Sequence, residues 1–129
     1  MDVISRLAKS FDLDCKKMSW TQFIVATKKE KIIGFGRLRQ YPDFTELATV
    51  GVIQQERGKG VGSYLVNALT NRGPQSIYVT CVIPDFFGRL GFKKVATFPL
   101  ILQKKVDFCK LYGFKDGEIF VMKIEKKNS

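Results

Sequence analysis

Three glycines at alternate positions constrain this chain most, because they stand between a predicted strand and a predicted helix. The strand is Thr45 to Ile53, and the glycines belong to residues 57–62 (R-G-K-G-V-G). Glycine adopts backbone conformations closed to other residues and lets the chain approach a ligand closely. Successive N–H groups, with those of the following helix and its positive dipole end, can then converge on an anion. Residues 57–62, called the anion cradle below, therefore predict a site for a doubly charged anion.

Two common phosphate-binding patterns do not fit the anion cradle. Lys59 is followed by Gly60 rather than by Ser or Thr, which excludes a Walker A loop. Ser63 stands where G-x-G-x-x-G requires its third glycine, which excludes the dinucleotide-binding pattern. The alternative that stays open is a strand-to-helix turn that uses glycine for flexibility and binds nothing.

The other elements follow from hydrophobic periodicity and from turn residues. We expect, in chain order, a helix over 2–11, a hairpin of strands 23–27 and 32–38, the strand 45–53, a helix from 61 that stops at 71–74, a strand over 77–83, a short helix over 84–90, a short strand over 92–97, a short helix over 99–106 and a strand over 118–124. The β-branched run at 77–83 is typical of a strand buried on both faces. This order predicts a mixed α/β (α+β) fold layered around one sheet, in a single domain spanning 1–129.

The net charge of +10 is spread along the chain without a dense basic block. A nucleic-acid-binding surface requires clustered Lys and Arg, so a nucleic-acid partner is disfavoured. The charge fits a solvated basic surface, and it is also compatible with a mild attraction for an anionic ligand.

Membrane, metal and histidine chemistry are disfavoured as well. No apolar run approaches the roughly 20 residues of a membrane span, and the first six residues lack the layout of a signal peptide. With no His and only three separated cysteines, Cys15, Cys81 and Cys109, the chain offers no zinc site and no Ser-His or Cys-His pair. We expect a soluble cytoplasmic protein with reduced cysteines, no metal and no membrane partner.

Two segments in register resemble one family. Val52 through Leu65 (V-I-Q-Q-E-R-G-K-G-V-G-S-Y-L) resembles motif A of the GNAT superfamily of N-acetyltransferases, [Q/R]-x-x-G-x-[G/A], with Arg57, Gly60 and Gly62 at its fixed places. Residues 86–92 (F-F-G-R-L-G-F) resemble motif B, F-Y-x-x-L-G-F. The resemblance covers about residues 20–97 and is nearest to small enzymes like N-acetylglutamate synthase.

The resemblance implies a mostly antiparallel central sheet with a V-shaped splay, flanked by helices. It also implies acetyl-CoA as co-substrate, with the pyrophosphate on the anion cradle and the pantetheine arm along the preceding strand. The implied residues that bind coenzyme A are Val50, Gly51, Val52, Arg57, Gly58, Lys59, Gly60, Val61, Gly62, Ser63, Cys81, Phe86 and Phe87.

An acceptor amine must lose a proton before it attacks a thioester, so a base is expected. The resemblance places Glu46 where many family members keep such a carboxylate; an exposed strand-end acid is the alternative, and Asp43 and Glu56 are poorer candidates. The usual general acid of motif B, a Tyr, is replaced by Phe87. Water is the favoured proton donor for the departing thiolate, with Tyr112 and Cys81 as alternatives; buried Cys is usually a small hydrophobe, which disfavours Cys81 as a nucleophile.

The acceptor implied by the resemblance is an amino-acid-like primary amine that attacks directly in a ternary complex. Arg37 and Arg39 could hold its carboxylate, or they could be surface charges. Aromatic side chains that could line its pocket, and that equally fit a core, are Trp20, Phe44, Phe98, Phe108, Tyr112 and Phe114. The chain begins close to its first helix without the family's usual opening strand, and a homodimer is one expected assembly. The alternative function is a non-catalytic acyl-CoA-binding module that acts as a sensor or interaction partner.

Overall fold

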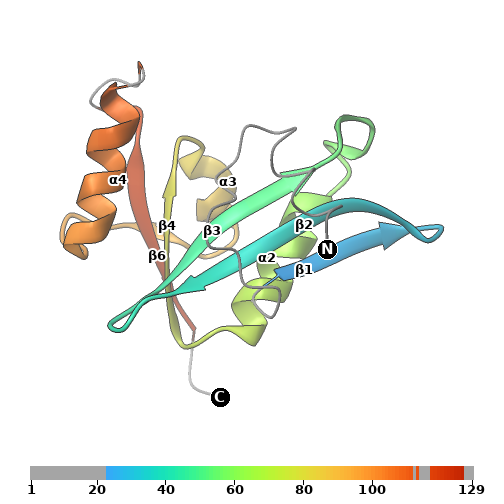
Figure 1. Ribbon diagram of the computed structural model, residues 1–129, viewed down its shortest axis with the longest axis horizontal. Coiled ribbons are helices and arrows are strands. Elements are labelled where there is room, and N and C mark those ends of the chain that lie inside the picture. The colour runs from blue at the N-terminus through green and yellow to red at the C-terminus, as the bar shows by residue number, and fades with distance from the viewer. Residues whose placement is uncertain (1–22, 112, 114–116, 127–129) are drawn as a thin grey trace. The chain divides into compact units, whose positions relative to one another are not determined.

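Figure 1 shows the computed structural model, which describes residues 23–111, 113 and 117–126. Its strands are β1 (Phe23–Lys28), β2 (Lys31–Gln40), β3 (Thr45–Val52), β4 (Ser76–Cys81), β5 (Lys93–Lys94) and β6 (Phe120–Glu125). Its helices are α2 (Val61–Arg72), α3 (Pro84–Arg89) and α4 (Leu100–Leu111), with a 3-10 turn, η2 (Gln54–Glu56). The helix predicted over 2–11 lies outside the described residues, as do Cys15, Trp20, Tyr112 and Phe114.

The strands form one sheet in the order β1-β2-β3-β4-β6-β5. The pairs β1–β2, β4–β6 and β5–β6 are antiparallel. The neighbours β2 and β3 are joined by residues 41–44, a connection that only antiparallel strands allow. Strands β3 and β4 pair in parallel at Glu46 and Tyr78. The predicted mixed, mostly antiparallel sheet with helices is therefore confirmed.

The chain divides into two compact units. The first contains the chain up to Arg39 together with Leu47–Gly73, and therefore holds the β1–β2 hairpin, the anion cradle and α2. The second contains Gln40–Glu46 and the chain from Pro74 onward, and holds β4 to β6 with α3 and α4.

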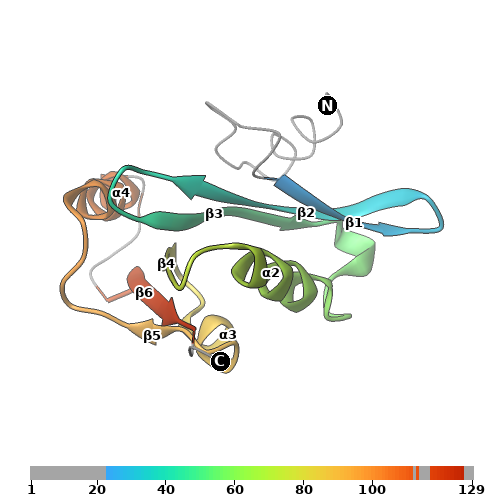
Figure 2. The same ribbon diagram turned by 90° about the horizontal axis from the view of Figure 1, so that it is seen from below.

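In the first unit, α2 lies along one face of the β1–β2 hairpin (Figure 2). Its apolar side chains Leu65, Val66 and Leu69 are buried because they recur on one side of the helix. Two glycines of β2 make the close approach possible. A Cβ atom at Gly36 would lie 2.6 Å from Cδ1 of Leu69, and one at Gly34 would lie 3.0 Å from Cδ1 of Leu65.

A two-residue turn, Lys29-Glu30, joins β1 to β2 in the ladder that pairs Lys28 with Lys31. Both turn residues have positive φ angles, 50° and 69°. Two positive φ angles in succession are typical of the type I′ turn, whose twist matches that of a hairpin. The predicted polar turn is confirmed, and it places Lys28 at the last position of β1.

In the second unit, α4 packs its buried residues Leu102 and Val106 against Val121 of β6. The observed helix is longer than the predicted span 99–106, and the predicted strand 92–97 is reduced to the two residues of β5. The region of β4 also differs from the prediction. The strand ends at Cys81 rather than at Ile83, because Pro84 begins α3.

The prediction that residues 77–83 are buried on both faces is wrong. Ile77, Val79 and Cys81 are buried, but the alternate residues Tyr78 and Thr80 are only half-buried. The apolar run continues beyond the strand into residues 82–83, which are exposed. Among the described residues, no helix has the length and apolar character needed to span a bilayer.

Candidate active site

The anion cradle is an open turn whose conformation only glycine adopts readily. Gly58 has a φ angle of 80° and Gly60 one of 87°, both in the left-handed region. A Cβ atom added at either position would meet nothing within 4 Å, so it is backbone conformation rather than crowding that selects glycine here. Gly62 lies in the first turn of α2. The cradle residues 57–60 are exposed, which leaves them accessible to a ligand.

The beginning of α2 adds to the cradle. Gly60 is the N-cap residue and supplies no side-chain hydrogen bond to the helix, and the first turn has no acidic residue. The N–H groups of the first turn, at Val61, Gly62 and Ser63, are therefore not capped by a side chain, and the positive end of the helix dipole points into the turn. Such a terminus suits a phosphate group.

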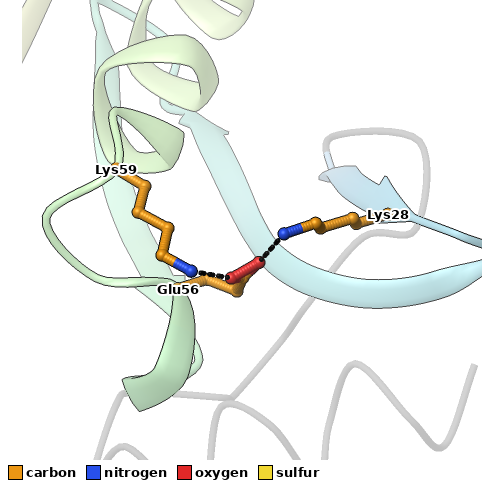
Figure 3. Close-up of polar contacts among 3 residues, drawn as sticks. All are labelled: Lys28, Glu56 and Lys59. Atoms are coloured by element: carbon orange, nitrogen blue, oxygen red, sulfur yellow. Dashed lines mark hydrogen bonds and ion pairs between the residues drawn. The ribbon is translucent and has the colours of Figure 1, made fainter.

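Side-chain contacts as well as the backbone conformation hold the cradle in place. The Arg57 Nε–H donates to the carbonyl oxygen of Val52, 3.1 Å away. Lys59 and Lys28 both reach the carboxylate of Glu56, at 3.0 Å and 2.9 Å respectively (Figure 3). The Glu56 side chain is only 9% exposed, whereas the two lysine side chains are more than half exposed. We call Lys28, Glu56 and Lys59 the Glu56 cluster.

The two lysines make Glu56 a weak candidate for a base. Hydrogen bonds from Lys28, and next from Lys59, lower the pKa of Glu56 below its ordinary value, because they stabilise the charged form. The sequence pattern indicated Lys59 as one of the residues that bind coenzyme A, but it did not connect Lys28 with the cradle. Lys59 follows Glu56 by three residues, a spacing from which their contact could have been predicted. Lys28 precedes Glu56 by 28 residues, and no local pattern links them.

A cleft of 370 Å³ opens beside the cradle within the first unit. Lys59, Gly60, Val61 and Tyr64 line it from the side of α2, with residues 25–27 of β1 and Ile33 of β2 opposite. Tyr64 is 63% exposed, so its ring is accessible from this cleft.

Among the described residues of the second unit, Glu46 is the most buried acid, and it is not an exposed strand-end residue. It is 1% exposed. Its Oε2 atom lies 2.7 Å from Nζ of Lys105, and its Oε1 atom accepts a hydrogen bond from the Tyr41 hydroxyl at 3.2 Å. Glu46 is therefore a buried carboxylate with a polar partner on each oxygen.

Three aromatic residues of the second unit contact one another. The Tyr41 ring stacks on Phe44 with 4.4 Å between ring centroids, and Phe44 meets Tyr78 edge to face at 5.8 Å. These three residues and Lys123 line a cavity of 670 Å³. Phe44 and Phe98 both pack against the α4 core, and Phe108 is 59% exposed, so the role of these aromatic residues in an acceptor pocket stays a prediction.

The comparison with known families agrees with the geometry of the cradle. A family model described as "Acetyltransferase (GNAT) domain" matches residues 19–94. The matched span includes both the anion cradle and residues 86–92 of motif B. The chain belongs to the GNAT acetyltransferase family.

One curated relative and two solved structures place this GNAT chain among known proteins. An uncharacterized N-acetyltransferase of Chlorobaculum tepidum is 30% identical over 78 residues, which are 57% of the chain and 50% of the relative. The chain thus matches about half the length of that relative. Rv2747 of Mycobacterium tuberculosis, solved in complex with CoA, is 19% identical with a TM-score of 0.75, covering 98% of this chain and 93% of that one.

The second solved structure is N-acetylglutamate synthase of Neisseria gonorrhoeae, complexed with coenzyme A and N-acetyl-glutamate. It is 15% identical with a TM-score of 0.72, covering 99% of this chain and 33% of that one. At these identities both solved structures support the GNAT fold and nothing finer.

The predicted coenzyme A residues of this GNAT chain are divided between the two units, and those at 50–52 and 57–63 belong to the first unit. Residues 57–63 form the cradle and the first turn of α2, and residues 50–52 lie on β3, with Gly51 buried and its two neighbours half-buried. The others lie in the second unit. Cys81 is 8% exposed and Phe87 is 7% exposed, while Phe86 is half-buried.

Cys81 has the environment of a structural thiol. Its Sγ atom lies 3.6 Å from Sδ of Met122, and burial raises its pKa above the ordinary value for a thiol. A raised pKa lowers the thiolate fraction, which disfavours nucleophilic attack at neutral pH.

Phe87 is a core residue of motif B. Its ring meets Phe86 and Phe92 edge to face, at 5.0 Å and 5.5 Å between centroids. Arg37 is likewise not a surface charge, because it is 2% exposed, with its guanidinium carbon 5.9 Å from the centroid of the Phe23 ring. No group of three or more Cys, Asp or Glu able to hold a metal ion occurs within residues 23–111, 113 and 117–126.

Proposed function

We propose that this protein is an acetyl-CoA-dependent N-acetyltransferase that acetylates the primary amine of a small, amino-acid-like acceptor. One observation carries the proposal. The anion cradle places two left-handed glycines before a helix whose first turn has no side-chain cap. Such a turn satisfies a pyrophosphate with backbone N–H groups, and it occurs here in the motif that gives the family its coenzyme A site.

The reaction is a direct transfer. The amine nitrogen attacks the thioester carbonyl, a C–N bond forms and the C–S bond breaks. Backbone N–H groups of β3, at residues 50–52, would polarise the carbonyl as an oxyanion hole does. The proton released by the amine passes to the carboxylate of Glu46, directly or through water. Coenzyme A leaves as a thiolate, which takes a proton from water because Phe87 offers none.

Tyr41 and Lys105 assist Glu46 by holding its carboxylate in one orientation. Both oxygens of Glu46 have a partner, at 2.7 Å and 3.2 Å. The Lys105 side chain is 39% exposed and donates a hydrogen bond to Oε2 of the buried acid. Glu46 is the catalytic residue of the proposal, and the other two are positioning residues.

Features of the second unit support an amino-acid-like acceptor. The cavity lined by Tyr41, Phe44 and Tyr78 also has one cation, Lys123, and one acid, Asp43, in its lining, and the Lys123 ammonium pairs with the exposed carboxylate of Glu125 at 2.8 Å. A lysine at an aromatic cavity can pair with an acceptor carboxylate while the rings hold its carbon chain. The neighbouring N-acetylglutamate synthase, which was solved with N-acetyl-glutamate, makes carboxylated amines the first acceptors to examine.

A second candidate function is a GNAT module that binds acyl-CoA without turning it over. The burial of Phe87 favours it, because the position that supplies a proton in many family members is here a core ring. Both candidate functions require coenzyme A to bind at the cradle, but only the enzyme transfers the acetyl group.

Thiol release separates them. The protein would be incubated with acetyl-CoA and with amino acids, polyamines or peptide amines, and free coenzyme A would be measured with a disulfide dye. The enzyme proposal expects at least one acceptor to raise thiol release above hydrolysis, with the acetylated amine found by mass spectrometry. Binding of coenzyme A without release across the whole panel would support the non-catalytic module instead.

A further inference from the structure

The Glu56 cluster contains two ammonium groups and a single carboxylate. Lys28 comes from the hairpin and Lys59 from the cradle, and they approach Glu56 from opposite sides (Figure 3). One lysine is enough to neutralise one carboxylate. The cluster therefore carries a net charge of +1, and one cation is in excess.

Lys59 is the member of the cluster that belongs to the anion cradle. It stands between Gly58 and Gly60, which are the two left-handed residues of the cradle. Its side chain is 58% exposed, so it can turn from Glu56 toward the cradle without disturbing a packed interior. An anion held by the cradle N–H groups would attract it more strongly than a carboxylate that already has another partner.

Such a move is costly unless Glu56 keeps a counterion. The Glu56 side chain is 9% exposed, and a buried carboxylate that loses its only cation is strongly destabilised. Lys28 prevents that situation. Its Nζ lies 2.9 Å from Oε1, whereas Lys59 uses Oε2, so the two contacts are independent.

We propose that Lys28 is the standing counterion of Glu56, which lets Lys59 leave Glu56 and bind the pyrophosphate of acetyl-CoA. The inference rests on the proposed function, because it assigns the anion of the cradle to coenzyme A. Lys28 is a positioning residue in this scheme, since it acts on the ligand through Glu56 and Lys59. The competing explanation is that the cluster merely ties the cradle to the hairpin.

Calorimetric titration with coenzyme A distinguishes the two explanations. Lys28→Met should weaken binding about 3- to 5-fold, the size expected when one exposed ion pair is lost, because Lys59 is then retained by Glu56. Glu56→Gln should bind at least as well as wild type, since it releases both lysines. The double variant Lys28→Met/Glu56→Gln should recover the affinity of Glu56→Gln to within about twofold. If the cluster only connects the cradle to the hairpin, the opposite result is expected. Both single variants then weaken binding of coenzyme A, and the double variant does not recover the affinity.

Two further variants make the result independent of how well Glu56→Gln folds. In a Lys59→Met background, Lys28→Met should have no further effect on affinity, because the counterion acts only through Lys59. Lys31→Met removes the same charge from the same hairpin and should leave affinity close to wild type. An equal loss in Lys31→Met, or additive losses in Lys28→Met/Lys59→Met, would overturn the inference. If wild type itself failed to bind coenzyme A, the proposed function would fall first and the inference with it.

Discussion

Nζ of Lys105 on α4 lies 2.7 Å from Oε2 of Glu46, a residue 59 positions earlier in the chain. Glu46 is 1% exposed, and Tyr41 donates to its other oxygen. The candidate base is therefore held in one orientation by two side chains from different segments. This arrangement distinguishes Glu46 from Asp43, the exposed acid on the nearby loop.

Glu46→Gln removes the proposed proton acceptor while keeping the size and the hydrogen-bonding capacity of the side chain. We expect kcat with the acceptor found by screening to fall about 10²- to 10⁴-fold, the range associated with loss of a general base. The affinity for coenzyme A should stay unchanged. Asp107→Asn, at an exposed acid of α4, is the matched control and should retain wild-type turnover. Wild-type kcat in Glu46→Gln would remove Glu46 from the mechanism.

Lys105→Met removes the ion pair of the buried Glu46 carboxylate and leaves the hydrogen bond from Tyr41. We expect the free energy of unfolding to fall by about 1–3 kcal/mol, the cost of leaving a buried polar group poorly satisfied. Lys104→Met, at the adjacent exposed position, should change it by less than about 0.5 kcal/mol. Denaturant unfolding followed by circular dichroism measures both. Equal stability of the two variants would show that the Glu46–Lys105 pair contributes nothing.

The pH dependence of stability tests the Glu56 cluster in the absence of ligand. Lys28 and Lys59 lower the pKa of Glu56 from its ordinary value of 4.5. A depressed pKa means that the folded protein binds the proton less tightly than the unfolded chain does. The stabilisation by Glu56 is therefore present above pH 4.5 and is lost as the pH falls through the lower pKa of the folded state.

Wild type should thus unfold at a higher denaturant concentration than Glu56→Gln at pH 7, and the difference should shrink as the pH falls below 4.5. Denaturation midpoints of the two proteins, measured side by side from pH 7 to pH 3, give the result. A difference that stays constant over this range would contradict the ion pairs, because it would not depend on the charge of Glu56.

Gly36 tests the packing that brings α2, and with it the cradle, onto the hairpin. Gly36→Ala would place a Cβ atom 2.6 Å from Cδ1 of Leu69, so the helix has to shift. We expect a loss of about 1–3 kcal/mol in the free energy of unfolding, typical of an overpacked core. Gly88→Ala in α3 adds the same methyl group where nothing lies within 4 Å, and it should be neutral or stabilising by up to about 1 kcal/mol. Thermal unfolding of both variants provides the comparison.

Local sequence patterns predicted much of the fold, because hydrophobic periodicity and turn residues act over only a few residues. Alternation in 45–53 and the turn K-K-E-K gave the strands, and Gly60 gave the start of α2, since each effect is confined to neighbouring residues. The burial prediction for 77–83 was wrong because an apolar run does not reveal which neighbours cover each face of the strand.

The cradle itself was predictable for the same reason, whereas its supporting contacts were not. The left-handed conformations of Gly58 and Gly60 are a property of the local backbone. The contacts Lys28–Glu56 and Lys105–Glu46 join residues far apart in the chain, and a single sequence does not determine which lysine reaches which carboxylate. The burial of Phe87 is similar, because its ring packing depends on Phe92 after the following turn.

Binding of acetyl-CoA by the anion cradle is the central claim, and calorimetry of wild type, Gly60→Asp and Gly117→Asp tests it most directly. Both glycines have positive φ, 87° and 84°, and both have open space where a Cβ would go, so the two substitutions impose the same backbone strain and charge. Only Gly60→Asp places a carboxylate in the cradle. The account predicts saturable binding in wild type and in Gly117→Asp, and no measurable binding in Gly60→Asp. Equal affinity in the two variants would contradict it.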